Sequence, residues 1–195
     1  MAKLADDGFS PTFMRNATAY GVSPRLRADI VVNNLVGIAY TTGEVFIQSD
    51  GTPWRPLVHV QDICRAFVAV LEAPREAIHN QAFNVGSTLE NYQVRDIAAM
   101  VQDVVPGCSV RYLEGGGPDP RCYRVNCDKL AATLPGFRTE WTVLLGVEEL
   151  YQSFVRYGLT GDMFARCVRL SRIKQLLDHD ELDSSLRRRT LPVVA

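Results

Sequence analysis

Apolar positions recur along the chain with two different periods, and these periods predict an alternation of helices and strands. In several segments every third or fourth residue is apolar, which is the spacing of a helix with one buried face. These segments are residues 29–40, 62–71, 94–105 and 143–157, and a shorter helix is predicted at 128–134. Residues 1–7 resemble the last turns of a helix that Gly8 would end.

Short segments with alternating or continuous apolar residues lie between the helical ones and predict strands. They are residues 10–15, 44–48, 56–60, 82–85, 109–113 and 123–126. Residues 16–24 are predicted as a loop. Strands that alternate with helices indicate an α/β fold, with a mixed α+β part towards the C-terminal end.

Composition narrows the class of protein. The 195 residues are 47% hydrophobic and 22% charged with a net charge of −1, which gives no general attraction to nucleic acid or to acidic lipid. The sequence contains no apolar run near the ~20 residues of a membrane span and no signal-peptide pattern at its start. We therefore expect a cytoplasmic protein with no membrane and no nucleic-acid partner. The five cysteines form no C-x-x-C pair, so the sequence indicates neither a disulfide framework nor a metal site.

The patterns of common catalytic sites are missing. The sequence contains no G-x-S-x-G, and its three histidines lack metal-ligand spacing. His59, between Val58 and Val60, is interpreted as a structural or loop-anchoring residue rather than a general base. The glycines at 115–117 precede a proline and no helix, so we interpret them as a loop rather than a dinucleotide cradle. No residue is predicted to be catalytic.

Polar side chains that suit phosphates and sugars are instead concentrated on the predicted loops. An arginine fork fits diphosphate oxygens, whereas asparagine and threonine fit sugar hydroxyls. The candidates are Asn16, Thr18, Tyr20, Ser23, Arg25, Arg27, Asn33, Asn34, Arg55, Asp119, Arg121, Tyr123 and Arg124. The alternative for any single arginine is an ordinary surface position.

Five segments, taken in order, carry a resemblance to a known family. They are Arg15–Gly21 (R-x-x-N/T-x-Y-G), Val31–Leu35 (V-V-N-N-L), Asp50–Ile63 (D-G-x-x-x-R-x-F/L-V/I-H-V-x-D-I/V), Phe83–Ser87 (F-N-V/L-G) and Pro118–Val125 (D-x-R-x-Y-x-V). Together they resemble the C-terminal portion of the NAD-dependent epimerase/dehydratase family, the nucleotide-sugar enzymes of the extended short-chain dehydrogenase/reductases. UDP-glucose 4-epimerase-like proteins belong to it.

The resemblance implies roles for individual residues. Residues that would contact the nucleotide-sugar are Thr18, Asn34, Arg55, Asp119 and Arg121, and those that would order the loops are Tyr20, His59 and Asp62. It also implies a fold, namely the C-terminal part of a Rossmann-type parallel sheet plus a smaller α+β substrate-binding domain.

The departures from the family concern its cofactor and its catalysis. The family's G-x-x-G-x-x-G and Y-x-x-x-K do not occur in these residues, so we expect the N-terminal cofactor-binding half to be absent. NAD(P) is implied by the family but is not expected to bind tightly to this chain alone. The expected organisation is an end of the Rossmann-like portion at 1–24, a substrate-binding portion at 25–164 that includes returning Rossmann-like strands near 56–60 and 82–86, and a helical tail at 165–195.

Two functional hypotheses follow. In the first, the chain is an epimerase/dehydratase-like protein that binds a nucleotide-sugar and is inactive alone, so its status as an enzyme stays open. In the second, it is a non-catalytic partner that forms an oligomer with a full-length paralogue through an exposed strand edge. Both lead us to expect exposed apolar surface near Phe13, Val31 and Phe67.

Overall fold

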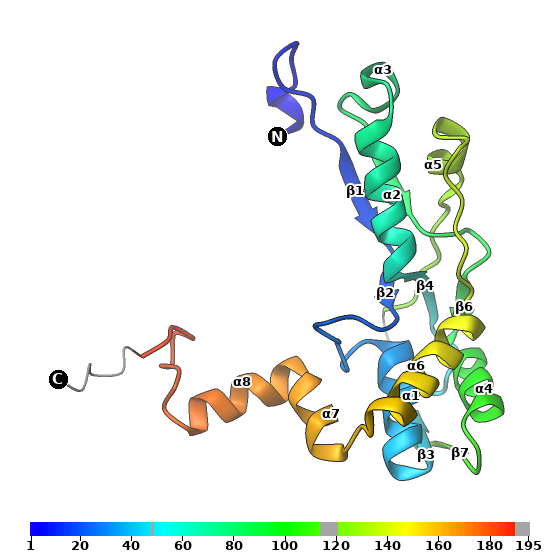
Figure 1. The fold of residues 1–195 in the computed structure, drawn as a ribbon, viewed down its shortest axis with the longest axis vertical. Coiled ribbons are helices and arrows are strands. Elements are labelled where there is room, and N and C mark those ends of the chain that lie inside the picture. The colour runs from blue at the N-terminus through cyan, green and yellow to red at the C-terminus, as the bar shows by residue number, and fades with distance from the viewer. Residues whose placement is uncertain (48, 114–120, 190–195) are drawn as a thin grey trace.

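The computed structural model describes residues 1–47, 49–113 and 121–189. Its strands are short and fall into three small sheets (Figure 1). Strand β1 (Phe13–Asn16) pairs in parallel with β5 (Ala82–Val85). Strand β4 (Trp54–His59) pairs in parallel with β2 (Thr18–Tyr20) and antiparallel with β6 (Asn91–Gln93). Strand β3 (Glu44–Ile47) pairs in parallel with β7 (Ser109–Tyr112).

Helices cover these sheets in two groups. Helices α1 (Val31–Thr42), α4 (Val94–Val104) and α6 (Val143–Tyr157) pack against one another. Helix α2 (Val60–Glu72) lies along the other part of the molecule with the short α5 (Asp128–Thr133), beside the β1–β5 pair. The remaining helices are η1 (Ala2–Leu4), α3 (Arg75–Ile78), α7 (Gly161–Cys167) and α8 (Arg169–Asp178).

Strand β4 lies between two hydrophobic cores. Successive side chains of a strand point to opposite faces of its sheet. Leu57 accordingly joins the larger core, which α1, α4 and α6 enclose, and Val58 joins the smaller core formed by α2, α5 and β5. The two cores thus share one strand.

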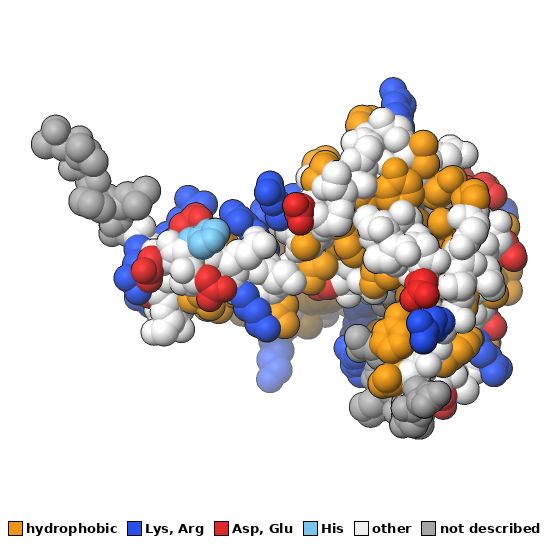
Figure 2. Space-filling model, turned by 90° about the horizontal axis from the view of Figure 1, so that it is seen from below, with side chains coloured by type: hydrophobic (Ala, Val, Ile, Leu, Met, Phe, Trp, Pro, Cys, Tyr) orange, Lys and Arg blue, Asp and Glu red, His pale blue; other side chains and the backbone are white. Residues whose placement is uncertain are grey.

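Helices α7 and α8 form an arm that leaves the rest of the molecule. Figure 1 shows α8 continuing away from the body towards the C-terminal end, and Figure 2 shows the same arm projecting in a view from below. Charged side chains of both signs cover its far end (Figure 2). In the part of the chain that the structure describes, no helix is long and apolar enough to cross a membrane.

The predicted fold class is confirmed, and so is most of the predicted order of elements. The bounds of β5 and α6 agree with the sequence pattern, as does the parallel pairing typical of an α/β fold. The predicted strand at 123–126 is wrong, because its backbone is held by other segments: the Val125 N–H donates to the Asn91 side chain at 2.9 Å. The helix expected at 1–7 is limited to η1, and residues 16–24 include β2. The glycines at 115–117 lie outside the described residues.

The expected apolar surface is present in part. Phe67 on α2 is 45% exposed, and its neighbours Val68 and Leu71 are exposed as well. Phe13 and Val31 are only half-buried. The exposed stripe therefore belongs mainly to the outer side of α2.

The five thiols differ in accessibility, which predicts their reactivity. Cys64 and Cys122 are exposed, whereas Cys127 is buried, and burial raises the pKa of the Cys127 thiol to about 11. Because the thiolate is the reactive form, iodoacetamide at about pH 8 should label Cys64 and Cys122 well before Cys127. Mass spectrometry of timed samples measures the order. In denaturant the rates should converge, and labelling of Cys127 as fast as Cys64 in the folded protein would contradict the packing.

Candidate functional site

A cavity of about 1100 Å³ opens beside the N-terminal ends of β2 and α1. Its lining comes from segments far apart in the sequence: Thr18 on β2, Asn34 on α1, Arg55 on β4, and Arg121 at the start of the described range 121–189. Ligand pockets for small molecules typically measure about 300–1000 Å³, so the space suits a ligand of nucleotide-sugar size.

The register of the sheet explains why Thr18 and Arg55 share this cavity. Thr18 lies opposite Leu57 in the parallel β2–β4 pair, and Arg55 is two residues before Leu57 on the same face of the sheet. The guanidinium of Arg55 donates hydrogen bonds to the carbonyls of Trp54, at 2.9 Å, and of Arg121. These bonds fix Arg55 in place and bring the segment at 121 to the cavity wall.

Two neighbouring asparagines of α1 hold the loop that forms the rim of the cavity. The Asn33 side chain is buried, accepts a hydrogen bond from the Gly21 N–H at 3.0 Å, and donates one to the Arg27 carbonyl at 3.1 Å. The Asn34 amide donates to the Ala28 carbonyl at 2.8 Å. Since an amide nitrogen carries two hydrogens, Asn34 keeps a second donor for a ligand.

The rim also carries an ion pair. Arg27 Nη2 lies 2.6 Å from Asp29 Oδ2, and both residues line the cavity. The hydrogen bond from the Arg27 guanidinium holds the pKa of the Asp29 carboxyl below its ordinary value. Asp29 therefore neutralises Arg27, and Arg55 and Arg121 line the same cavity.

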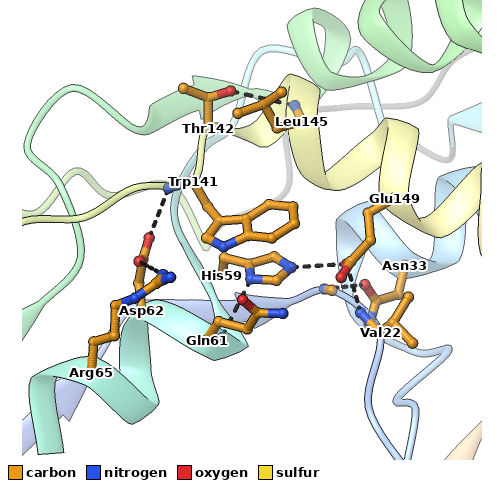
Figure 3. Close-up of polar contacts among 11 residues, drawn as sticks. Val22, Asn33, His59, Gln61, Asp62, Arg65, Trp141, Thr142, Leu145 and Glu149 are labelled. Atoms are coloured by element: carbon orange, nitrogen blue, oxygen red, sulfur yellow. Dashed lines mark hydrogen bonds and ion pairs between the residues drawn. The ribbon is translucent and has the colours of Figure 1, made fainter. Parts of the chain in front are cut away.

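The C-terminal end of β4 leads into a buried polar cluster centred on His59 (Figure 3). His59 is 0% exposed, and its Nδ1 accepts a hydrogen bond from the Gln61 N–H at 3.3 Å, which caps the N-terminus of α2. Its Nε2 lies 2.9 Å from Glu149 Oε2 on α6, so the ring donates to that carboxylate. Trp141 stacks on the imidazole with ring centroids 3.8 Å apart.

The His59 ring also dictates the residue beside it. Gly21 has φ +107°, a region that side chains rarely adopt, and a Cβ there would lie 2.2 Å from His59 Nε2. The same Glu149 oxygen that accepts from His59 accepts from the Val22 N–H at 3.0 Å. The backbone after β2 therefore passes directly over the ring, and only glycine fits at position 21.

Asp62 joins α2 to the segment that precedes α6. Its carboxylate is 1% exposed and accepts from the backbone N–H groups of Glu140, at 3.1 Å, and Trp141, at 3.1 Å. Arg65 completes the arrangement with ion pairs of 2.9 Å to Asp62 and 2.6 Å to Glu140. Asp62 thus orders a distant loop, while the capping bond of its own helix comes from His59.

Tyr20 and Glu90 form the innermost part of this cluster. Tyr20 is 2% exposed and meets His59 edge-on at 5.2 Å, and its hydroxyl has no hydrogen-bond partner among the described residues. Burial, and next the nearby Glu90 carboxylate, raise the pKa of Tyr20 far above its ordinary value. Glu90 accepts from the Val143 N–H at 2.7 Å, yet burial still raises the pKa of its carboxyl.

The residues to which the family resemblance assigned roles fall into two places on the structure, whereas the further candidates Asn16, Ser23, Arg25 and Arg124 do not line the cavity. Thr18, Asn34, Arg55 and Arg121 share the cavity, and Tyr20, His59 and Asp62 share the buried cluster. Asp119 lies outside the described residues. Within the described part of the chain, no three His, Cys, Asp or Glu side chains gather as a metal site.

Sequence reasoning missed the partners that complete the cluster. Trp141 and Glu149 contact His59 from about eighty and ninety positions away, and Glu90 reaches the start of α6. A lone tryptophan or glutamate beside a helix carries no local signal of such a contact. Phe46, which also lines the cavity, looked like an ordinary strand residue.

Comparison with known proteins shows which family model and which folds this chain is similar to. Residues 2–86 match the model of the NAD dependent epimerase/dehydratase family. Among solved structures, the chain is similar to the UDP-glucuronic acid 4-epimerase from Bacillus cereus, with 23% identity, a TM-score of 0.62, and coverage of 75% of this chain and 45% of that one. It is also similar to the epimerase Mth375 from Methanothermobacter thermautotrophicus, with 22% identity, a TM-score of 0.66, and coverage of 77% and 45%.

A dehydratase shares the same fold. The dTDP-glucose 4,6-dehydratase from Bacillus anthracis is 18% identical with a TM-score of 0.62, and the match covers 77% of this chain and 46% of that one. The chain thus spans about half the length of the solved structures that it matches.

The Asp62 carboxylate should be a large contributor to stability. Asp62→Asn replaces an acceptor oxygen by an NH₂ group that would face the N–H groups at 140 and 141, so we expect a loss of about 2–4 kcal/mol. Urea unfolding followed by circular dichroism measures the change. The exposed Asp103→Asn on α4 is the matched control and should cost less than about 0.5 kcal/mol. Equal effects of the two substitutions would contradict the stabilising role of the hydrogen bonds that Asp62 accepts from residues 140 and 141.

Glu90 should make stability fall as the pH rises. Its folded pKa is raised above the unfolded value of about 4.3, so its contribution is greatest below that value and declines as the pH passes through the folded pKa. Glu90→Gln removes this titration. As the pH rises from about 4 to about 8, the unfolding free energy of Glu90→Gln should therefore increase relative to that of wild type. Exposed Glu72→Gln should show no such trend, and parallel curves for Glu90→Gln would overturn the assignment.

Proposed function

Because residues 2–86 match the model of the NAD dependent epimerase/dehydratase family, we propose that this chain binds a nucleotide-sugar in the cavity beside β2 and α1. We further propose that the chain does not transform the sugar by itself. The 195 residues contain neither G-x-x-G-x-x-G nor Y-x-x-x-K, the family's cofactor and acid–base motifs. The proposed activity is therefore binding and orientation of the substrate.

The observation that carries this proposal is the convergence of Thr18, Asn34, Arg55 and Arg121 on one cavity. Arginine guanidinium groups bind diphosphate oxygens through paired hydrogen bonds, and the hydroxyl and amide suit sugar oxygens. The bonds from Arg55 to the backbone at 54 and 121 hold this arrangement before a ligand arrives, which lowers the ordering cost of binding.

The sugar nucleotide to test first comes from a similar protein. The Bacillus cereus epimerase is described in complex with UDP-glucuronic acid and NAD. The cavity of this chain is large enough for such a molecule. UDP-glucuronic acid is therefore our probe for the proposed class.

NAD does not fit the described residues in the same way. Dinucleotide sites place a glycine-rich turn between a strand and the start of a helix, where the pyrophosphate approaches backbone N–H groups. In the described ranges, the strand β5 leads through Gly86 to β6 rather than to a helix. We therefore expect only weak binding of NAD and derive no hydride-transfer step for this chain. The five free thiols support a cytoplasmic location as part of the proposal.

Calorimetric titration with UDP-glucuronic acid tests the binding function. Thr18→Asp introduces a negative charge into the cavity without removing a hydrogen bond of the folded chain, so it should weaken binding at least about tenfold by repelling the diphosphate. Ser109→Asp, exposed on β7 outside the cavity, is the matched control and should bind like wild type. Absence of binding to wild type, or equal affinities for Thr18→Asp and wild type, would overturn the proposal.

A second function, that of a subunit docking on a full-length paralogue, is favoured by the edge of β1. The Phe13 and Ala17 N–H groups donate to Gln81 and Val85 on the β5 side. Since backbone groups alternate in direction along a strand, those of Met14 and Asn16 point to the other edge, which no described strand occupies. Parallel sheets are normally covered on both faces, and open edges attract further strands.

Hydrogen–deuterium exchange with residue resolution tests the docking function. Alone, the amides of Met14 and Asn16 should exchange faster than those of Phe13 and Ala17. On mixing with a full-length family member from the same genome, Met14 and Asn16 should become protected if a strand of the partner joins β1. Unchanged exchange at both positions in a mixture that shows complex formation would place the interface elsewhere, and no complex would reject this function.

A further inference from the structure

An aromatic side chain, Phe164, anchors helix α7 to the body. The Phe164 side chain is 7% exposed and lies over Gly37, in the middle of α1. A Cβ at position 37 would lie 2.0 Å from the Phe164 ring, so the ring occupies the space that the missing side chain leaves. The Thr160 hydroxyl caps the start of α7 by accepting from the Met163 N–H at 3.2 Å.

The end of the same helix is bonded to the rim of the cavity. The Cys167 carbonyl accepts a hydrogen bond of 3.1 Å from the N–H of Ala28, a residue with 0% exposure. The Ala28 carbonyl in turn accepts the bond of 2.8 Å from the Asn34 side chain. A continuous path of two hydrogen bonds thus connects the arm to Asn34, a side chain of the cavity wall.

Helix α1 gives this path a fixed geometry. Gly37 follows Asn34 by three residues, so the contact with Phe164 and the side chain of Asn34 lie on neighbouring turns of one face of α1. Arg169, the first residue of α8, adds an attraction to Asp29 on the same rim. The arm therefore contacts the rim loop through the bond between Cys167 and Ala28, and it packs on α1 through Phe164.

We propose that α7 positions the cavity rim. The packing of Phe164 on Gly37, which we call the seat of Phe164, keeps the Cys167 carbonyl within hydrogen-bond distance of the Ala28 N–H. This bond in turn orients the loop 27–29 and the Asn34 side chain for the ligand. The inference deepens the proposed nucleotide-sugar binding and rests on it for its effect on affinity. Phe164 and Cys167 act through other residues and are positioning residues. With α7 in place Ala28 is fully buried, so the Cys167 carbonyl is the partner that its N–H depends on.

A double-mutant cycle tests the seat. Phe164→Ala removes the anchor, and Gly37→Ala pushes the ring out of its place, so each should weaken UDP-glucuronic acid binding roughly tenfold in calorimetric titration, the size of effect expected from one lost buried hydrogen bond. In the Phe164→Ala background, Gly37→Ala should have little further effect, because the new methyl group enters empty space. Additive losses would overturn the proposed seat.

Two controls separate positioning from loss of stability. Met163→Ala changes a 45% exposed residue of the same helix and should leave affinity unchanged. Leu134→Ala opens the smaller core away from the cavity, so it should lower the melting temperature without lowering affinity. If Leu134→Ala weakens binding as much as Phe164→Ala does, the effect is general destabilisation and the inference is wrong.

Amide exchange measured by NMR on the ligand-free protein distinguishes failure of this inference from failure of the proposed function. In Phe164→Ala, the Ala28 amide should exchange at least about tenfold faster than in wild type. The Gly21 amide, bonded to Asn33 in the same loop, is the internal control and should keep its rate. If wild type binds no nucleotide-sugar, this readout alone decides the positioning role. An Ala28 amide that keeps its wild-type rate would overturn it.

Discussion

Strand β4 imposes the constraint on which the rest of the structure depends. Its six residues must serve two cores at once, so a shift of its register by a single position would exchange the faces of Leu57 and Val58 and disrupt both. The pairing of Thr18 with Leu57 and of Tyr20 with His59 carries the same register into β2. Cavity and buried cluster are therefore two ends of one face of the same sheet.

Continuity of the chain after β4 links this face to distant segments. The strand runs directly into α2, and the first turn of that helix presents Asp62 to the N–H groups at 140 and 141. Those residues lead into α6, whose Glu149 returns to His59. These polar contacts therefore connect the end of β4, through α2 and the segment at 140–141, to α6 and back to His59 of β4. Each buried charge in it has a partner, as burial of charge requires.

The sequence predicted the elements whose signal is local and missed those whose partners are remote. Helix α6 and strand β5 have long or strongly apolar patterns, and their bounds were correct. Strands β2 and β6 have three residues each and exist because β4 supplies their hydrogen bonds, which no local period records. The expected strand at 123–126 failed for the converse reason, since the Asn91 side chain takes its backbone bond.

The candidate site likewise has residues that the sequence singled out and contacts that only the structure shows. Resemblance to a family singled out Thr18, Asn34 and Arg55, and the fold brings them to one cavity. Their gathering could not come from spacing alone, because it depends on the β2–β4 register and on the start of α1. The contacts of Trp141 and Glu149 with His59 required the structure, since they connect the segment before α6, and α6 itself, to the end of β4.

The cavity and the open edge of β1 depend on different cores. The cavity lies on the larger core, where Leu35 and Ile47 belong both to the cavity wall and to the hydrophobic core itself. The β1–β5 pair lies on the smaller core and contributes Phe83 and Val85 to it. The proposed ligand site therefore lies on the larger core, and the proposed pairing at β1 would engage the smaller one. Since β1 continues through Ala17 into β2, and both Ala17 and Thr18 line the cavity, the proposed pairing at β1 would lie next to the cavity wall in the chain.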